Sequence, residues 1–303
     1  MTARIVVLGS FNADLVSYMA RLPGEGETVM GDRFVTGPGG KGSNQAVAAA
    51  RLGAEVTFIA RVGRDSLAEI GLSLWQAEDI DRRFVGRDAD APTGVATIFV
   101  DREGHNVIVV TSGANAALRP AHVDAAEHAI AAADVLLTQL ESPLDTVTYA
   151  LKLARKHRVS TILNPAPAQR LDSSVLQYVD LLTPNEHELS IVAGEPDAES
   201  AARAVFAEGV NTLVTTLGRQ GASWTKKDGS SAVVPAYSVR SVDTVGAGDA
   251  FNGALAVALA EDKALPEAIA FANAAAAVSV TRAGAAASMG RRAEVDALMA
   301  TQG

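Results

Sequence analysis

Short runs of β-branched and aliphatic residues alternate along this chain with longer segments rich in alanine and leucine. The short runs lie at residues 5–8, 56–59, 135–138, 161–163, 181–183 and 213–216, and the longer segments lie at 43–52, 67–78, 120–132, 144–157 and 198–208. Strands that alternate with helices of ordinary length are typical of βαβ units, whose helices cover both faces of a sheet. The pattern therefore predicts an α/β fold with three layers, in the order helix, sheet, helix.

The alternation breaks at residues 14–36 and 93–110, which have the pattern of antiparallel strands. In the second segment, strands at 94–100 and 106–110 flank a turn, and a further hairpin is expected at 223–235. The first two segments adjoin strand ends and helix starts, where an α/β sheet forms its ligand crevice, so we expect a small β-sheet lid. A thin, apolar lid needs a partner on its other face, which predicts a homodimer through the lid sheet.

Composition narrows the class of protein. The 303 residues, 48% of them hydrophobic, are enough for one α/β domain spanning residues 1–303 with the lid segments inserted in it. A formal charge of −9 without a basic run argues against nucleic acid or an anionic membrane as partner and favours a small molecule. The absence of cysteine excludes disulfides and thiolate metal sites. The apolar run at residues 5–9 is too short for a signal peptide or membrane span, so we expect a cytoplasmic protein.

The clearest chemical signal is the turn Gly246-Ala247-Gly248, which leads through Asp249 into helix formers at 254–260. Unpaired N–H groups at a helix start favour negative charge, and residues this small let a phosphate approach the main chain. Asp249 would take the proton of an attacking hydroxyl. A lone aspartate in a first helical turn is more often a cap, but capping does not need the small residues before it. The combination favours phosphoryl transfer to an alcohol.

A second glycine-rich loop spans residues 37–46. It matches G-x-G-x-x-G but lacks the Walker spacing, a preceding buried strand and a suitable acid about twenty residues later, which disfavours a nicotinamide dinucleotide site. As a substrate site, it would expose the main chain of Gly39 and Gly40, while Lys41 and Asn44 would bond hydroxyl groups. Both side chains are also common as solvated residues near a helix start, so this loop alone leaves the two interpretations open.

Together, residues 39–48 and 243–249 resemble the two signatures of the ribokinase-like carbohydrate kinases. Further matching segments lie at 9–14, 113–118, 139–144, 164–167, 183–186 and 281–285, so the resemblance covers nearly the whole chain. It implies a Rossmann-like α/β/α domain of the ribokinase-like fold. It also implies an ATP-dependent enzyme that phosphorylates a sugar, with the 5-hydroxyl of D-ribose as the expected acceptor and ribose 5-phosphate as the product. Phe11, where an aliphatic residue is common, and the lid segment 17–21 depart from the family pattern.

The resemblance implies a role for individual residues around the sugar and the phosphoryl group. The sugar would be held by Asn12, Asp14, Gly40, Lys41, Asn44 and Glu141. Asp249 would be the general base, and the amides of Gly246, Ala247 and Gly248 would form an anion hole for the transferred group. A contact from Asp14 to the sugar 2-hydroxyl would disfavour a deoxy sugar, which leaves that buried carboxylate unpaired.

The resemblance also implies a nucleotide site and two ion sites. ATP would be bound by Asn185, Thr216, Gly218, Gly221, Gly248 and Asn273. Glu188 would hold Mg²⁺ through water, since magnesium keeps its waters readily. An activating monovalent cation, expected to be K⁺, would lie at Asp243, Val245, Ser279, Arg282, Gly284 and Ser288, with main-chain oxygen as the only ligand from Val245 and Arg282. Without the resemblance, Asn185 would be a turn residue and 282–285 the end of a helix.

Three alternatives stay open. A sister kinase for deoxyribose, 2-keto-3-deoxygluconate or a nucleoside would keep Asp249 and differ in the lid, where Tyr18 and Phe34 are too few aromatic residues to decide. A sugar-binding regulator without catalysis would carry a damaged 246–249 segment, which is intact here. A nicotinamide oxidoreductase would need a cofactor site for which the chain gives little reason.

Overall fold

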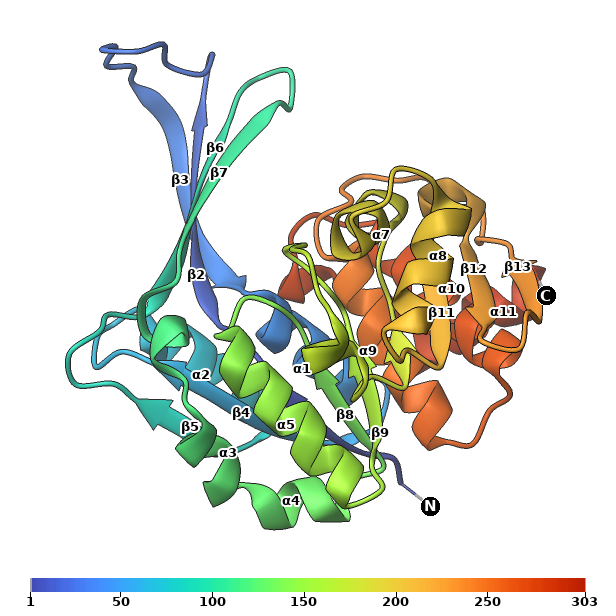
Figure 1. Cartoon of the computed structure of the whole chain (residues 1–303). Helices are drawn as coiled ribbons and strands as arrows, with labels where there is room; N and C mark the ends of the chain where they lie inside the picture. Colours follow the sequence, from blue (N-terminus) through green and yellow to red (C-terminus); the bar gives the residue numbers. More distant parts are fainter. Residues whose placement is uncertain (1, 303) are drawn as a thin grey trace.

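Nine strands form the main sheet of the computed structural model, which describes residues 2–302 (Figure 1). Their order is β13-β12-β11-β10-β9-β8-β1-β4-β5, and neighbours from β11 to β5 run parallel, whereas β12 and β13 are antiparallel additions. The strands are β1 (Arg4–Leu8), β4 (Glu55–Val62), β5 (Asp81–Arg87), β8 (Val135–Thr138), β9 (Ser160–Leu163), β10 (Leu181–Leu182), β11 (Thr212–Thr216), β12 (Ala222–Lys226) and β13 (Ser231–Val234).

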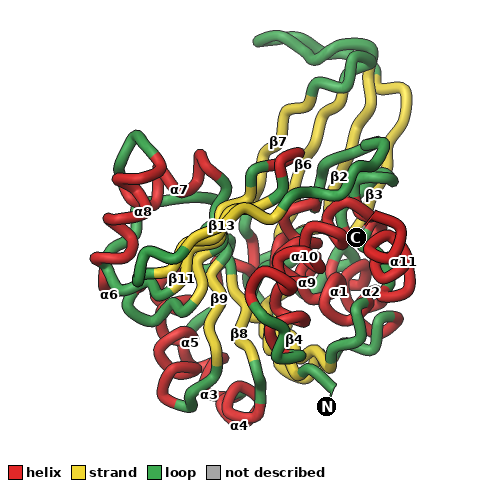
Figure 2. The backbone as a smooth tube through the Cα atoms, turned by 90° about the vertical axis from the view of Figure 1, so that its right-hand side faces the viewer, coloured by secondary structure: helices red, strands yellow, loops and turns green. Residues whose placement is uncertain are grey.

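Helices cover both faces of this sheet, which Figure 2 shows edge-on between them. One face carries α1 (Lys41–Arg51), α2 (Ala68–Ala77), α9 (Ala247–Ala260), α10 (Leu265–Ser279) and α11 (Arg292–Gln302). The other carries α3 (Pro120–Ala125), α4 (Glu127–Ala132), α5 (Leu144–Lys156), α6 (Ser173–Leu176), α7 (Glu186–Ala193) and α8 (Ala198–Ala207). In β1, Ile5 and Val7 enter one core while Val6 and Leu8 enter the other, as the strand period of two requires. The predicted three-layer α/β/α fold is confirmed.

A second sheet projects from the core beside the carboxyl ends of the central strands (Figure 1). It has the order β3-β2-β6-β7, and its strands are β2 (Asn12–Met19), β3 (Gly31–Gly39), β6 (Gly94–Val100) and β7 (Asn106–Thr111). β2 pairs antiparallel with β3 and parallel with β6, so the two predicted lid segments do form one small sheet. Apolar side chains are exposed on it, among them Phe34 and Val109. The homodimer stays a prediction.

The core differs from the expected elements in several places, since α6, α7, α10 and α11 were not among the predicted helices. The helix predicted at 120–132 is two short helices, because the backbone at Ala126 leaves helical geometry with φ −101° and ψ 5°. The strand β5 was not predicted, since its sequence DRRFVGR is charged and lies at the sheet edge. No helix among residues 2–302 is long and apolar enough to cross a membrane. The single domain at 1–303 stays a prediction, and its first and last residues lie outside the described part of the chain.

Close packing of α1 against α9 generates a stability prediction. A Cβ at Gly253 would lie 2.6 Å from the Cβ of Ala48 and 2.8 Å from the carbonyl oxygen of Gln45. We expect Gly253→Leu to lower the free energy of unfolding by roughly 1–3 kcal/mol, because overpacking forces the helices apart. Leucine has a higher helix propensity than glycine, so a lower free energy of unfolding in this variant would come from overpacking and not from helix propensity. Urea denaturation measures it.

The control for this substitution is Gly37→Ala, since a Cβ at Gly37 meets nothing within 4 Å. An unfolding midpoint of Gly253→Leu equal to that of the wild type would contradict the close packing of the two helices.

Candidate active site

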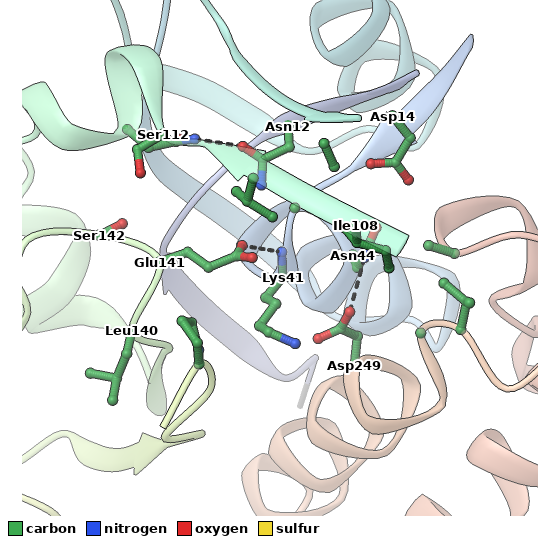
Figure 3. Close-up of a pocket in the computed structure, with 18 of the residues that line it drawn as sticks. Asn12, Asp14, Lys41, Asn44, Ile108, Ser112, Leu140, Glu141, Ser142 and Asp249 are labelled. Carbon is green, nitrogen blue, oxygen red and sulfur yellow. Dashed lines mark hydrogen bonds between the residues drawn. The ribbon is translucent and has the colours of Figure 1, made fainter. Parts of the chain in front are cut away.

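A cavity of about 720 Å³ lies between the small sheet and the carboxyl ends of the central strands. Its floor comes from the start of α1, the segment after β8 and the start of α9 (Figure 3), and the lining residues from the small sheet include Ile98 and Ile108. The lining includes every residue predicted to hold a sugar, namely Asn12, Asp14, Gly40, Lys41, Asn44, Glu141 and Asp249. The structure thus brings together side chains from four separate parts of the sequence.

Gly40 lets two of these parts meet. Its backbone has φ +85°, and a Cβ there would lie 2.6 Å from the amide nitrogen of Asn12 and 2.7 Å from the Cα of Phe11. Only glycine accommodates both the left-handed conformation and this approach. Because α1 begins at the next residue, the contact sets Lys41 and Asn44 beside the first residues of β2.

Asn115, a residue to which sequence reasoning gave no role, holds Asn12 in place. Its side chain accepts a hydrogen bond from the Phe11 N–H at 3.0 Å and donates to the Phe11 carbonyl at 2.8 Å and to Asn12 Oδ1 at 2.9 Å. Asn115 is buried, and these bonds use both of its N–H donors and its oxygen. Asn12 therefore presents its remaining amide hydrogens from a fixed position.

Glu141 is fixed by the start of α1. Its Oε2 accepts hydrogen bonds from the Lys41 N–H at 2.9 Å and from the Ser10 hydroxyl. A carboxylate is favoured at this place because the first N–H groups of a helix lack intrahelical partners. Ser10 was also missed by sequence reasoning, and its hydroxyl accepts in turn from the Gly42 N–H at 3.4 Å.

Asp249 is the most deeply placed acid of the cavity, with 6% of its surface exposed. Its Oδ2 accepts from Asn44 Nδ2 and its Oδ1 from Gln45 Nε2, each at 2.9 Å. Burial raises the pKa of the carboxyl, and the charge of Glu141 adds to this, whereas Lys41 and the two amides oppose it. Figure 3 shows the Lys41 side chain extending towards Asp249.

Lys41 and Asp14 complete the charges of the site. Burial alone would lower the pKa of the Lys41 ammonium, but the carboxylates of Asp249, Glu141 and Glu188 outweigh it and raise that pKa. For Asp14, burial first and then the charges of Glu141 and Asp249 raise the pKa to about 7. The cavity lining therefore holds one cation, Lys41, and two acids whose raised pKa opposes ionisation, Asp14 and Asp249.

The turn before α9 has the geometry of an anion site. Gly246 is left-handed with φ 78°, and α9 starts at Ala247, so the first N–H groups of the helix lie at this turn. In this state the Ala247 N–H donates to the Thr244 carbonyl at 3.2 Å. Gly248 is exposed, and a Cβ built on it would have no heavy atom within 4 Å, so a bulky anion can approach its main chain.

The residues predicted for a monovalent cation lie behind this turn. Asp243 bonds the Val245 N–H at 3.0 Å through one oxygen and the Gly284 N–H at 2.9 Å through the other, which joins the two loops. The hydroxyls of Ser279 and Ser288 donate to carbonyls three residues earlier, those of Ala276 and Ala285. The side chain of Arg282 instead pairs with Glu294.

Of the residues predicted for the nucleotide, Asn185, Thr216, Gly218 and Gly221 lie at or after the ends of the neighbouring strands β10 and β11, whereas Gly248 lies on α9 and Asn273 on α10. Asn185 and Thr216 form a parallel β-bridge, while Asn185 and Glu188 cap α7 reciprocally, with both bonds at 2.8 Å. Gly218 and Gly221 bound the loop after β11, with φ +57° and φ +101°. The amide of Asn273 donates to the carbonyls of Val234 and Pro235. Among residues 2–302, the cavity lining includes none of these side chains.

Such a site can carry out proton abstraction beside a group transfer. A buried carboxylate faces a cavity large enough for a small sugar, with a lysine beside it and a helix start next to it that accepts an anion. Asp249 and the Gly246–Gly248 turn are adjacent in sequence, so a proton acceptor and an anion site at these positions would stay aligned.

Comparison with known proteins identifies the family to which this chain belongs. The family model described as "pfkB family carbohydrate kinase" matches residues 2–291. The chain is 42% identical to a ribokinase of Haemophilus influenzae, with 97% of each chain covered, and 40% identical to a deoxyribokinase of Salmonella typhi, with 83% of this chain and 84% of that one covered. The structure of Arabidopsis thaliana ribokinase complexed with ribose and ATP matches at a TM-score of 0.91 and 31% identity over 99% of both chains. This chain belongs to the pfkB family of carbohydrate kinases.

Proposed function

We propose that the protein transfers the γ-phosphoryl group of ATP to the 5-hydroxyl of D-ribose, giving ribose 5-phosphate and ADP. The observation that carries this proposal is the buried Asp249 carboxylate, which faces a sugar-sized cavity at the start of α9. The similarity to ribokinases over nearly the full length supports ribose as the acceptor. The deoxyribokinase at 40% identity makes 2-deoxyribose the second candidate.

In the proposed reaction, Asp249 accepts the proton of the 5-hydroxyl as that oxygen attacks the γ-phosphorus. The new bond joins the sugar oxygen to phosphorus, and the bond from phosphorus to the β–γ bridging oxygen of ATP breaks, releasing ADP. The main-chain N–H groups of Gly246, Ala247 and Gly248 stabilise the charge on the transferred group, and the Ala247 N–H exchanges its bond to Thr244 for this role.

The sugar is held, in this proposal, by Asn12, Asp14, Gly40, Lys41, Asn44 and Glu141. Asn115 and Ser10 support this set through Asn12 and Glu141. Ile98 and Ile108 cover the sugar from the small sheet, which acts as a lid. A carboxylate such as Asp14 accepts from sugar hydroxyls and so favours an acceptor that keeps its 2-hydroxyl.

The nucleotide and ions occupy the neighbouring positions. We propose that Asn185, Thr216, Gly218, Gly221, Gly248 and Asn273 bind ATP. Mg²⁺, when bound, would neutralise charge on the phosphates, and Glu188 would hold it through water, since carboxylates and water are the ligands magnesium prefers and the Glu188 charge is close enough to Lys41 to raise the pKa of that lysine. K⁺ would organise the loops that Asp243 already joins, with oxygen ligands at Asp243, Val245, Ser279, Arg282, Gly284 and Ser288.

Assembly and location are parts of the same proposal. A homodimer through the small sheet would cover the apolar side chains there, such as Phe34 at 62% and Val109 at 55% exposure. A cytoplasmic location would give the enzyme its ATP.

The substrate assignment predicts ribose-dependent ADP release. We expect turnover with ATP, Mg²⁺ and ribose that requires K⁺ and is lost when a bulky organic cation replaces it. For 2-deoxyribose we expect kcat/KM to be lower by about 100-fold or more, since the Asp14 carboxylate loses its partner. Fructose, 2-keto-3-deoxygluconate and adenosine complete the panel. A preference for one of these compounds would change the assigned substrate. The absence of turnover with every compound of the panel would favour a sugar-binding regulator.

The base assignment predicts that Asp249→Asn folds and binds ATP but loses turnover by about 10²- to 10⁴-fold, the usual contribution of general base catalysis. Asparagine keeps the shape and can still accept from Gln45 through Oδ1, while its Nδ2 can donate to Asn44 Oδ1 once the Asn44 amide turns, so we expect the fold to be kept. Steady-state ADP release and isothermal titration with ATP measure the two properties. Near-normal turnover of a folded variant would remove Asp249 as the base.

The raised pKa of Asp14 predicts pH-dependent sugar binding. In the free enzyme this carboxyl is protonated below pH about 7, and sugar hydroxyls donate to its ionised form, so ribose binding must release the proton there. The Kd for ribose should therefore rise as pH falls from 8 to 5.5, by up to about tenfold per pH unit. Calorimetric titrations without ATP measure this.

Asp14→Asn is the matched control for this titration. This variant should bind ribose more weakly at pH 8, and its Kd should rise less as the pH falls. The rise in Kd that remains would come from protonation of Asp249. A wild-type Kd that stays constant between pH 8 and 5.5 would exclude ionised Asp14 as a sugar ligand.

A further inference from the structure

Gln45 follows Asn44 on α1 and is completely buried, yet it is not among the residues that line the cavity. Its amide makes hydrogen bonds at both ends. Nε2 donates to Asp249 Oδ1 at 2.9 Å and to Asn164 Oδ1 at 3.1 Å, and Oε1 accepts from Gln139 Nε2 at 2.6 Å. A glutamine without access to the cavity therefore contacts the proposed base directly.

The network allows the Gln45 amide only one orientation. The nitrogen of Asn164 donates to the Thr183 carbonyl at 3.0 Å, so its oxygen must face Gln45. The ionised Asp249 carboxylate can only accept. Gln45 must then turn its NH₂ towards both acceptors, and Gln139 holds the opposite end. Gln139 and Asn164 follow the carboxyl ends of β8 and β9, so the main sheet itself anchors this amide.

We propose that Gln45 is a positioning residue for phosphoryl transfer, whose buried amide fixes the orientation of the Asp249 carboxylate and stabilises its ionised form. The inference rests on the proposed function, in which Asp249 is the general base. The division of labour on α1 is then clear, since Asn44 contacts Asp249 from inside the cavity and Gln45 contacts it from the protein interior.

The charges around Asp249 make this second donor necessary. Lys41 on α1 faces it as the one cation of the cavity lining, while Glu141 after β8 adds negative charge and Asp14 on β2 adds a carboxyl whose pKa is raised to about 7. Burial and Glu141 favour the protonated carboxyl, which cannot act as a base. Loss of the Gln45 donor would leave Asp249 Oδ1 unpaired in a buried site, so the Asp249 carboxyl would stay protonated to higher pH. Only the hydrogen bond from Asn44 to Oδ2 would then hold the orientation of the carboxyl.

Gln45→Met tests the proposal, because methionine has a similar length and no strong donor. We expect kcat to fall about 10- to 100-fold, as for loss of a hydrogen bond to a charged group. The KM for ribose should change less than about threefold, since Gln45 does not line the cavity. The acid limb of the kcat–pH profile should move upwards by about one pH unit. A structural defect alone would not move that limb.

Ser43→Ala is the matched control. Ser43 lies on the same helix, is equally buried and accepts a hydrogen bond from Trp75 Nε1 at 2.9 Å, away from Asp249. It should leave both kcat and the acid limb near their wild-type values. Gln45→Glu provides a second variant of conserved shape, in case methionine prevents folding. Its carboxyl would face Asp249, so the acid limb should move upwards here too.

Asp249→Asn, measured in the same series, separates this inference from the function on which it rests. If Asp249→Asn is inactive while folded Gln45→Met or Gln45→Glu keeps the wild-type kcat and acid limb, the positioning role is overturned. If Asp249→Asn itself retains turnover, the base assignment fails first. An upward shift with a preserved KM, absent in Ser43→Ala, supports Gln45.

Discussion

The structure depends on the burial of one carboxylate, because an ionised acid removed from water is costly unless several donors replace the lost hydration. Asp249 obtains these donors from two consecutive residues of α1, more than two hundred positions earlier in the chain. The helices α1 and α9 must therefore meet at their N-terminal ends. Glu141, which increases the cost of a second negative charge, must be balanced by Lys41.

Glycines make this meeting possible at the level of the backbone. Gly253 on α9 leaves room for Ala48 on α1, and Gly42 packs against Gly9 and Ser10 at the end of β1. Side chains at these places would separate the helices from each other and from the sheet. The polar residues of the cavity would then lose the distances of about 3 Å on which hydrogen bonds depend. The close approach of α1 to α9 and to β1 therefore determines both the packing of these elements and the hydrogen bonds of the buried charges.

Much of the fold was predictable because buried strands and amphipathic helices have a regular period. The charged edge strand β5 and the break at Ala126 were not, since tertiary pairing and a local backbone angle decide them. Among the residues that line the cavity, Gly40, Lys41, Asn44 and Asp249 were predictable through two glycine-rich signatures, and Asn12, Asp14 and Glu141 through further segments of the family resemblance.

The supporting polar residues were not predictable in the same way. Gln45, Asn115 and Ser10 are polar positions inside apolar stretches, and nothing along the chain reveals which distant partner each one meets. The one signal was their presence in segments of family resemblance. Asn185 and Glu188 are different, because the spacing of three that marks them also makes a capping box, and the structure shows that box formed.

The pairing of β2 has a consequence for how this enzyme can diversify. Asn12 lies at the fixed root of the small sheet, between Gly39 and Gly94 and against Asn115, whereas the exposed apolar residues lie further along the strands. Changes at the tip can alter the exposed apolar surface without displacing Asn12 and its neighbours at the root. Changes at the root can alter the cavity without rebuilding the tip. The proposed sugar selectivity and the proposed subunit pairing could therefore evolve as separate traits on one strand.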